Sequence, residues 1–440
     1  MLPNLTAYDP IGSNSGSIDP LGALQTYGVL AEMLLPGVTT VTSRSRYLSM
    51  ISAALWNAEN YRRFLPGASG LVQRRKAVEP FERLWALACV AARSEGVELA
   101  SDGLRGVRDA TKNFQRFAKK QSKVNPDFKM LKYQSRTGAV GTYWTAMAGG
   151  ELIHTESGAL AAEGIDLARL FPQPPITRKD QKRLSDPDVA HRVSMPFDEM
   201  VEWADSCNLV AAKPTERELL NDALTADDRR DCVARALSEI SKSGGLPEEW
   251  QTAEWRDLRV KLESNERARS LGLPSIVNAI IATEQFHESV LVVFQVLLWW
   301  GTKHADKSIN DLIDQRDFQK ATKRCRETAV ALREYSENCD QPDVREAVSG
   351  LLGFAFTIER SATPQHVVDE ILRRHREVQS GKVSGGMRKK DWLAYESGKI
   401  LRPSPRFQLT EHPPKAAGNK LTHPYRIEQF IYMLTENCFF

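Results

Sequence analysis

The sequence has few cysteines and no marked excess of charge of either sign. Its six cysteines, among 440 residues, show neither a CxxC pair nor a regular spacing. Disulfide frameworks and zinc sites need such spacing, so we expect reduced and mostly buried thiols, as in the cytosol. The 59 basic and 56 acidic residues leave a net charge of +3, which by itself neither indicates nor excludes a nucleic-acid partner.

A long hydrophobic run is also lacking. The most apolar stretch, 289–301 (SVLVVFQVLLWWG), has about a dozen apolar residues and is interrupted by Gln295. A membrane-spanning helix needs about 20 such residues, so we predict a buried core helix here. Residues 1–17 are polar and rich in turn formers, without the basic and apolar regions of a signal peptide. We therefore expect a cytoplasmic protein with no membrane contact.

Common sequence motifs of catalysis are missing as well. The chain has no GxxxxGK phosphate loop, no GxSxG nucleophile turn and no Cys/His cluster with zinc spacing. Two Glu-x-x-His pairs, Glu151–His154 and Glu284–His287, place both side chains on one helix face, as in di-iron bundles. Such bundles need further glutamates on facing helices, so we interpret both as satisfied polar pairs. We thus expect no catalytic residue, no metal ligand and no cofactor.

Helical periodicity is abundant. The apolar fraction of 42% and the charged fraction of 26% are typical of a globular protein. Apolar residues recur at helical spacing nearly throughout, and alternating strand-like runs are scarce. We predict a mainly α fold of multi-helix bundles with a small winged-helix unit. The expected segments are an N-terminal helical bundle at 1–125, a winged-helix-like unit at 126–171, a linker and connecting helix at 172–215, a C-terminal helical domain at 216–380, and a basic, loop-rich C-terminal segment at 381–440.

The winged-helix prediction depends on the order of short elements after residue 137. A helix at 139–147 ends at a Gly-Gly pair, and two short strand-like pieces, 152–154 and 159–161, flank a tight turn before a helix at 163–171. This rhythm resembles the back half of many bacterial winged-helix domains, in which one helix enters the major groove of duplex DNA. The alternative is a helical hairpin with a small structural ribbon.

The small net charge hides an uneven distribution along the chain. A first basic segment, 104–136, holds ten basic and two acidic residues, a net +8. A second, 371–426, holds thirteen basic and four acidic residues, a net +9, so the remainder carries −14. Clustered cations bind polyanions because neutralised phosphates release their counterions. A solvated helix face for the first segment, and a mobile tail for the second, are the alternatives.

The candidate nucleic-acid ligands come from both basic segments and from the predicted recognition helix. In the first segment and the helix after it they are Arg116, Lys119, Lys120, Lys123, Lys129, Lys132, Arg136, Thr137, Thr142 and Tyr143. In the second segment, a glycine-flanked basic loop contributes Arg388, Lys389 and Lys390. Phosphate contacts would position the strand, and residues of the recognition helix would face a groove.

The most motif-like stretch is 34–47 (LLPGVTTVTSRSRY). Pro36-Gly37 ends one helix, and the Thr/Ser run caps the next. Arg44 and Arg46 then stand at the start of that helix, where the macrodipole disfavours cations. They are therefore candidates for holding phosphate beside the helix N–H groups, with buried ion pairing as the alternative.

This stretch resembles the opening of uncharacterised bacterial proteins with an LLPGxTTxTSRxRY-type signature, which are associated with defence and mobile elements. The resemblance implies a component of an anti-phage defence system. Together with the basic segments, it favours a non-catalytic, nucleic-acid-binding subunit whose partners are duplex DNA and other proteins of the same system. A structural adaptor that binds partner proteins and a nuclease with an unrecognised site are the alternatives.

Overall fold

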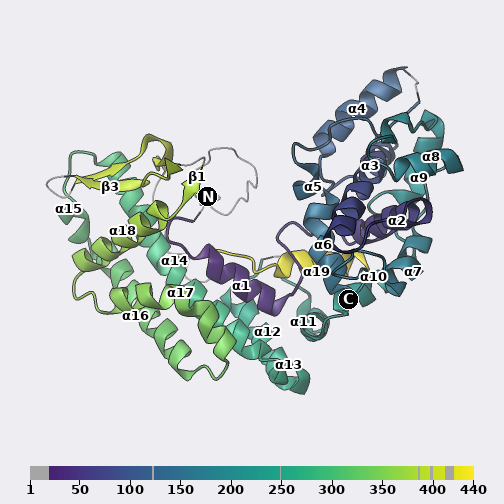
Figure 1. The fold of residues 1–440 in the computed structure, drawn as a ribbon. Coiled ribbons are helices and arrows are strands. Elements are labelled where there is room, and N and C mark those ends of the chain that lie inside the picture. The colour runs from purple at the N-terminus through teal and green to yellow at the C-terminus, as the bar shows by residue number, and fades with distance from the viewer. Residues whose placement is uncertain (1–18, 121–122, 248, 385–386, 397–399, 412–420) are drawn as a thin grey trace. The chain divides into compact units, whose positions relative to one another are not determined.

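The computed structural model describes residues 19–120, 123–247, 249–384, 387–396, 400–411 and 421–440. Helices dominate it, so the predicted mainly α fold is confirmed (Figure 1). The chain divides into two compact units. Unit 1 comprises Met1–Leu34 and Gly245–Tyr425, and unit 2 comprises Leu35–Gly244 and Arg426–Phe440. Each unit is therefore built from two separate stretches of the sequence.

This grouping differs from the segments expected along the sequence. The range 126–171 belongs to unit 2 together with most of 1–125 and all of 172–215, while the expected domain 216–380 is divided at Gly244. The expected C-terminal segment is also divided, because α19 (Ile427–Glu436) belongs to unit 2. Local composition identifies loops and turns, but only long-range packing groups elements into units.

Unit 2 is assembled around α2 and α3. Its helices are α2 (Arg46–Tyr61), α3 (Gly67–Ser94), α4 (Val107–Lys120), α5 (Gln134–Thr137), α6 (Ala139–Gly149), α7 (Ala162–Leu170), α8 (Arg178–Leu184), the 3-10 turn η1 (Ala190–Arg192), α9 (Phe197–Cys207), α10 (Pro214–Thr225), α11 (Asp228–Gly244) and α19. Phe81, Leu84 and Trp85 lie at helical spacing on α3 and are buried. Trp85 donates from Nε1 to the Cys207 carbonyl oxygen at 2.6 Å, which ties α3 to the end of α9.

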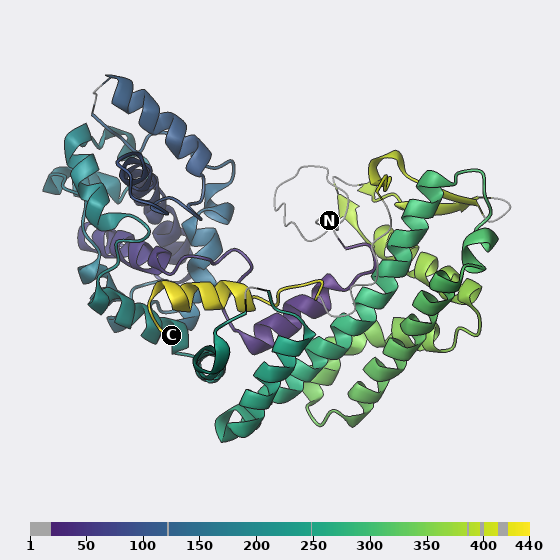
Figure 2. The same ribbon diagram turned by 180° about the vertical axis from the view of Figure 1, so that it is seen from behind.

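Unit 1 is assembled around α14 (Leu273–Lys303), which contacts α1, α12, α16, α17 and α18. Figures 1 and 2 show α14, α16 and α17 side by side. The other elements are α1 (Leu24–Leu34), α12 (Thr252–Ser264), α13 (Glu266–Ser270), α15 (Asn310–Ile313), α16 (Arg316–Asn338), α17 (Pro342–Glu359), α18 (Pro364–Ser380) and the 3-10 turn η2 (Pro405–Phe407). Among the described residues, α14 alone is long and apolar enough to cross a membrane, and most of its apolar window is buried inside the protein, as predicted for a core helix.

Two small antiparallel hairpins complete unit 1 in a range expected to be loop-rich. Strand β1 (Val383–Ser384) pairs with β2 (Met387–Arg388), and β3 (Leu393–Glu396) pairs with β4 (Ile400–Pro403). Trp392, just before β3, is buried and stacks on Phe407 with ring centroids 4.3 Å apart. One aromatic anchor thus fixes a segment that has too few apolar residues to show a strand pattern.

The winged-helix unit is not confirmed. The expected ribbon is reduced to an isolated antiparallel bridge between Ile153 and Leu160. The helix expected to enter a groove, α6, instead packs against α2, α3, α5 and α10, with Val140 and Met147 buried. In unit 2 this helix is a core element, because a broad face of it, including the positions expected to read a groove, is buried against these neighbours.

Candidate nucleic-acid interface

Helix α4 has one buried face and one basic face. Ala110, Phe114 and Phe117 repeat at helical spacing and are buried, and Phe114 contacts Phe197 of α9 with ring centroids 5.5 Å apart. The opposite face exposes Arg108, Lys112, Arg116 and Lys119. Since a helix rises 1.5 Å per residue, this row of cations extends over about 16 Å.

Several arginines on other helices have an acidic partner in the same helix, which most of the α4 cations lack within the described residues. On α11, α16 and α18, Arg235, Arg333 and Arg373 each have a carboxylate oxygen at 2.6–2.8 Å, three or four residues away. On α4, Lys112 has one at 3.6 Å, from Asp109. Within the described ranges, no ion pair forms at Arg108, Arg116 or Lys119. Their charge therefore faces solvent without local neutralisation.

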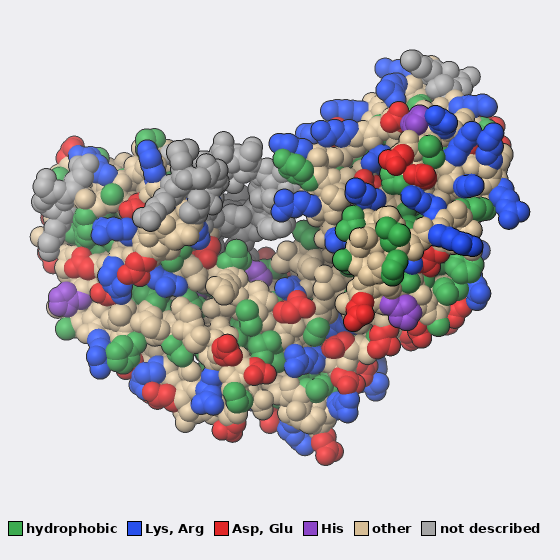
Figure 3. Space-filling model, in the orientation of Figure 1, with side chains coloured by type: hydrophobic (Ala, Val, Ile, Leu, Met, Phe, Trp, Pro, Cys, Tyr) green, Lys and Arg blue, Asp and Glu red, His purple; other side chains and the backbone are tan. Residues whose placement is uncertain are grey.

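The segment between α4 and α6 extends this charge. Val124 forms an antiparallel bridge with Met195, and buried Met130 lies against Gly106, so the segment is held to the body of unit 2 at two points. Four cations of this segment are exposed and form no ion pair in the described part of the chain: Lys123, Lys129, Lys132 and Arg136. With the α4 row they make up what we call the basic surface: Arg108, Lys112, Arg116, Lys119, Lys123, Lys129, Lys132 and Arg136. Figure 3 shows Lys and Arg side chains gathered on unit 2 over the region of α4.

A buried carboxylate positions α5 and α6 beneath this surface. Glu82 of α3 accepts a hydrogen bond from the Ala139 backbone N–H at 2.7 Å, and another from Gln134 Nε2 at 3.0 Å. Burial raises the pKa of Glu82 to about 7, and these two hydrogen bonds oppose the rise. An acceptor at the first N–H groups of α6 also suits the helix dipole. Glu82 thus holds the Gln134 side chain before Arg136 and the Ala139 backbone after it.

Arg44 and Arg46 are buried, with 3% and 1% of their surface exposed. Arg44 Nη1 lies 3.1 Å from Glu436 Oε1, and its Nε donates to the Asp102 carbonyl oxygen at 2.6 Å. Arg46 Nε lies 3.2 Å from Glu216 Oε1. Both guanidinium groups form ion pairs inside unit 2, as in the alternative of buried ion pairing. We therefore correct the prediction and remove both arginines from the candidate interface.

Thr142 and Tyr143 of α6 are also buried, so they do not face a groove. The Tyr143 hydroxyl accepts hydrogen bonds from the backbone N–H groups of Ser43 and Arg44, at 3.2 and 3.1 Å. Its ring stacks on Tyr47 with centroids 4.5 Å apart. Tyr143 thus holds the start of α2, and we remove Thr142 and Tyr143 from the interface because both side chains are buried.

The second basic segment belongs to unit 1, and many of its cations bond within that unit. Lys382 Nζ donates to the Asp19 carbonyl oxygen at 2.6 Å, and Arg374 Nε donates to the Leu21 carbonyl oxygen at 2.9 Å. Lys390 is exposed and Lys389 is half-buried. Two further predicted ligands, Lys120 and Arg388, have side chains outside the described part of the structure. The first segment is therefore the stronger candidate.

Sequence reasoning missed one basic helix. Residues 172–215 were expected to form a linker and a connecting helix, yet α8 forms there, with the Thr177 side chain accepting the Asp180 N–H at 3.2 Å as an N-cap. It exposes Arg178, Lys179 and Lys182 on unit 2. The dense cluster TRKDQKR at 177–183 is the signal that could have identified it.

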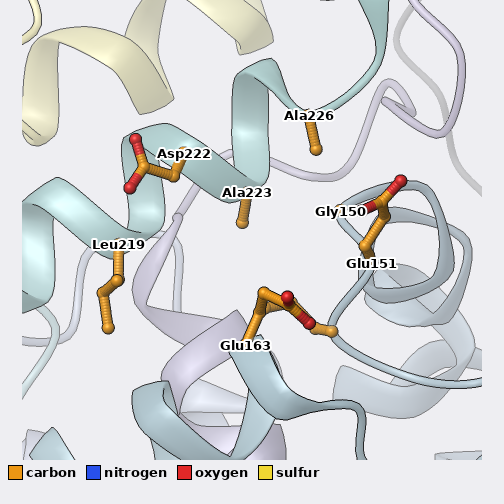
Figure 4. Close-up of a pocket in the computed structure, with 8 residues that line it drawn as sticks. Gly150, Glu151, Glu163, Leu219, Asp222, Ala223 and Ala226 are labelled. Atoms are coloured by element: carbon orange, nitrogen blue, oxygen red, sulfur yellow. The ribbon is translucent and has the colours of Figure 1, made fainter.

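A pocket of about 230 Å³ in unit 2 has an acidic lining, opposite in charge to the basic surface. Glu151, Glu163 and Asp222 line it together with the apolar Leu219 and Ala223. In Figure 4 the three carboxylate groups do not converge on one point. In agreement, the described residues contain no group of three His, Cys, Asp or Glu side chains placed to hold a metal ion. An acidic lining repels phosphate, so the pocket lies outside the nucleic-acid interface.

The two Glu-x-x-His pairs have different environments. Glu151 and His154 are exposed in a turn. Glu284 and His287 are buried on α14 and share Thr422, whose Oγ1 donates to Glu284 Oε2 at 2.9 Å and lies 3.1 Å from His287 Nδ1. Burial raises the pKa of Glu284 to about 7 and lowers that of His287 to about 4. The second pair holds Thr422 against α14 and is a structural contact of unit 1.

No family model, no curated protein and no solved structure matches this chain. Any functional assignment therefore depends on the chain's own residues, and among these the basic surface is the most distinctive feature.

Proposed function

We propose that this protein binds nucleic acid through the basic surface of unit 2. The observation that carries the proposal is a set of eight exposed cations on α4 and the segment after it, of which one, Lys112, has an acidic partner in the described structure. Unpaired surface cations repel one another, so their clustering opposes folding slightly. A polyanionic ligand neutralises that repulsion and releases its own counterions.

The expectation of duplex DNA came from a predicted recognition helix. The helix at that position, α6, buries the residues that would have read a groove. What supports binding is charge, which recognises the phosphate backbone without reading sequence. DNA is the polymer we propose. We also propose that the chain is a non-catalytic subunit of a multi-component defence system, as the resemblance of residues 34–47 implies. Arg44 and Arg46 of that motif would then act by holding unit 2 together.

The test is a charge reversal on α4 with a matched control in the same unit. Arg116→Glu with Lys119→Glu reverses two cations that form no ion pair within the described residues, and Arg235→Glu with Lys242→Glu reverses two charges on α11. Fluorescence anisotropy with a labelled oligonucleotide, across a range of salt concentrations, reads out affinity and salt dependence. We expect the α4 variant to weaken binding by about tenfold or more and to lower the salt slope by about 2, while the α11 variant leaves both nearly unchanged.

Equal affinities for the α4 variant and the parent chain would overturn the proposal. If the parent chain itself shows no salt-dependent binding to nucleic acid, the proposal is likewise overturned, and the adaptor alternative, in which the basic surface meets an acidic protein surface, becomes the one to test. Circular dichroism of both variants verifies that the helices are retained.

A further inference from the structure

One large aromatic side chain stands exposed within the basic surface. Tyr133 has 47% of its surface exposed and lies immediately before α5. The flanking cations are close in sequence: Lys129 and Lys132 precede it, and Arg136 follows within one turn. Lys132 Nζ lies 5.3 Å from the centroid of the Tyr133 ring, a cation–π contact at the surface.

The backbone of Tyr133 is held in place. Its carbonyl oxygen accepts hydrogen bonds from the N–H of Arg136 at 3.0 Å, from the N–H of Thr137 at 2.9 Å, and from Thr137 Oγ1 at 2.9 Å. The Thr137 carbonyl oxygen in turn accepts a hydrogen bond from Arg105 Nε. The exposed ring therefore projects from a fixed turn, and binding a ligand on its face costs little ordering entropy.

An exposed ring among unpaired cations matches the chemistry of single-stranded nucleic acid. Cations hold the backbone phosphates, while a base stacks on an aromatic face, and every base offers such a face. In a duplex the bases already stack on one another and present their edges in the grooves, so a ring at the surface has no base to stack on. The stacking partner of Tyr133 must then be an unpaired base.

From these contacts we infer that the basic surface takes single-stranded nucleic acid, with an unpaired base stacked on Tyr133 and flanking phosphates held by Lys129, Lys132 and Arg136. This inference rests on the proposed function and specifies its substrate class. Single-stranded DNA and RNA share the required chemistry. Phe356 of α17 offers a control for this inference. Its ring is also exposed and has Arg360 3.9 Å from its centroid, but it lies outside the basic surface.

The experiment compares Tyr133→Leu and Tyr133→Phe with the control Phe356→Leu in the full chain. Anisotropy measures binding of labelled oligo(dT), oligo(rU), a duplex of equal length, and an abasic strand that keeps the phosphates and lacks bases. We expect Tyr133→Leu to weaken binding of oligo(dT) or oligo(rU) by about 5- to 100-fold. Binding of the duplex and the abasic strand should stay within about twofold. Tyr133→Phe, which keeps the ring, and Phe356→Leu should bind like the parent chain.

The two arms of the design distinguish this inference from the proposed function. If Tyr133→Leu leaves single-strand binding unchanged while the α4 charge reversal weakens it, the charge-based function stands and the stacking inference is overturned. If Tyr133→Leu weakens abasic and base-containing strands equally, stacking is likewise overturned, because the loss does not depend on bases. If neither variant changes binding, both proposals fail. The relative affinities of oligo(dT) and oligo(rU) decide between DNA and RNA.

Discussion

The Glu436 carboxylate lies 3.1 Å from the Arg44 guanidinium, although 392 residues separate the two along the chain. The same carboxylate accepts hydrogen bonds from the backbone N–H and the hydroxyl of Ser45, both at 3.0 Å. Helix α19 therefore closes unit 2 by placing an anion at the start of α2, where the helix dipole favours one. Burial raises the pKa of Glu436, and Arg44 opposes that rise.

Breaking the Arg44–Glu436 ion pair from either side should destabilise unit 2. Arg44→Ala would leave Glu436 without its cation, and Glu436→Gln would leave the Arg44 charge without its acid. We expect either change to lower the free energy of unfolding by about 3 kcal/mol, since each strands a buried charge. Urea denaturation followed by tryptophan fluorescence measures the loss. Glu428→Gln, at an exposed position of the same helix, is the control and should cost less than about 1 kcal/mol.

The Arg46–Glu216 pair is more deeply buried, with both side chains 1% exposed. Arg46→Met alone should cost about 3–5 kcal/mol, because Glu216 would remain as an uncompensated buried charge. Combining it with Glu216→Leu should recover much of that loss, since two apolar side chains need no charge partner. A double-mutant cycle from denaturation curves measures the coupling. Additive effects of the two changes would contradict the assigned ion pair.

Glu82 should make the folded protein less stable as the pH rises from 4.5 to about 7. Its pKa in the folded protein is about 7, above the ordinary value of 4.5, so the folded state holds the proton more tightly than the unfolded state. Its contribution to stability is therefore greatest below pH 4.5, falls as the pH rises to about 7, and is constant above that. Glu82→Gln should remove about 1–3 kcal/mol of this fall. The measurement is the free energy of unfolding at several pH values between 4.5 and 8; an unchanged profile would show that Glu82 does not titrate there.

His375 should have the opposite effect within unit 1. It is buried, its Nδ1 lies 3.0 Å from the Pro20 carbonyl oxygen, and its Nε2 accepts the Trp392 backbone N–H at 2.9 Å. Burial lowers its pKa, and an imidazolium could not accept from Trp392. Its stabilising effect is therefore complete above pH 6.5 and is lost as the pH falls through the lowered folded-state pKa.

Hydrogen exchange at the Trp392 amide tests this role directly. Protection of that amide should fall in acid for the parent chain, and His375→Phe should lose it at every pH because the acceptor is gone. The Thr422 amide, which donates to Glu284 Oε2 in the same unit, is the internal reference and should keep its protection in the variant. Equal exchange at Trp392 in both proteins would show that His375 does not hold this segment.

The exposed surface of α4 illustrates what was predictable. Apolar spacing predicted a helical bundle over 1–125, and the imbalance of Lys and Arg over acids predicted the basic character of 104–136, because both properties are local. The absence of acidic partners for Arg116 and Lys119 among the described residues was not predictable, since a distant acid could have packed against them. Arg44 and Arg46 also stood in a suggestive motif, but both are buried in ion pairs. Because their partners, Glu436 and Glu216, lie far away in sequence, the motif alone did not reveal this pairing.

The sequence by itself determined the helical class, the buried character of α14 and the location of the two basic segments. These follow from periodicity and composition, which act over a few turns of helix. Tertiary structure alone decided that α6 is a core helix and that two motif arginines are internal. It also decided that Tyr133 stands exposed among cations without ion pairs in the described part of the chain. Burial and charge pairing depend on which distant residues meet, and neighbours along the chain do not specify those contacts.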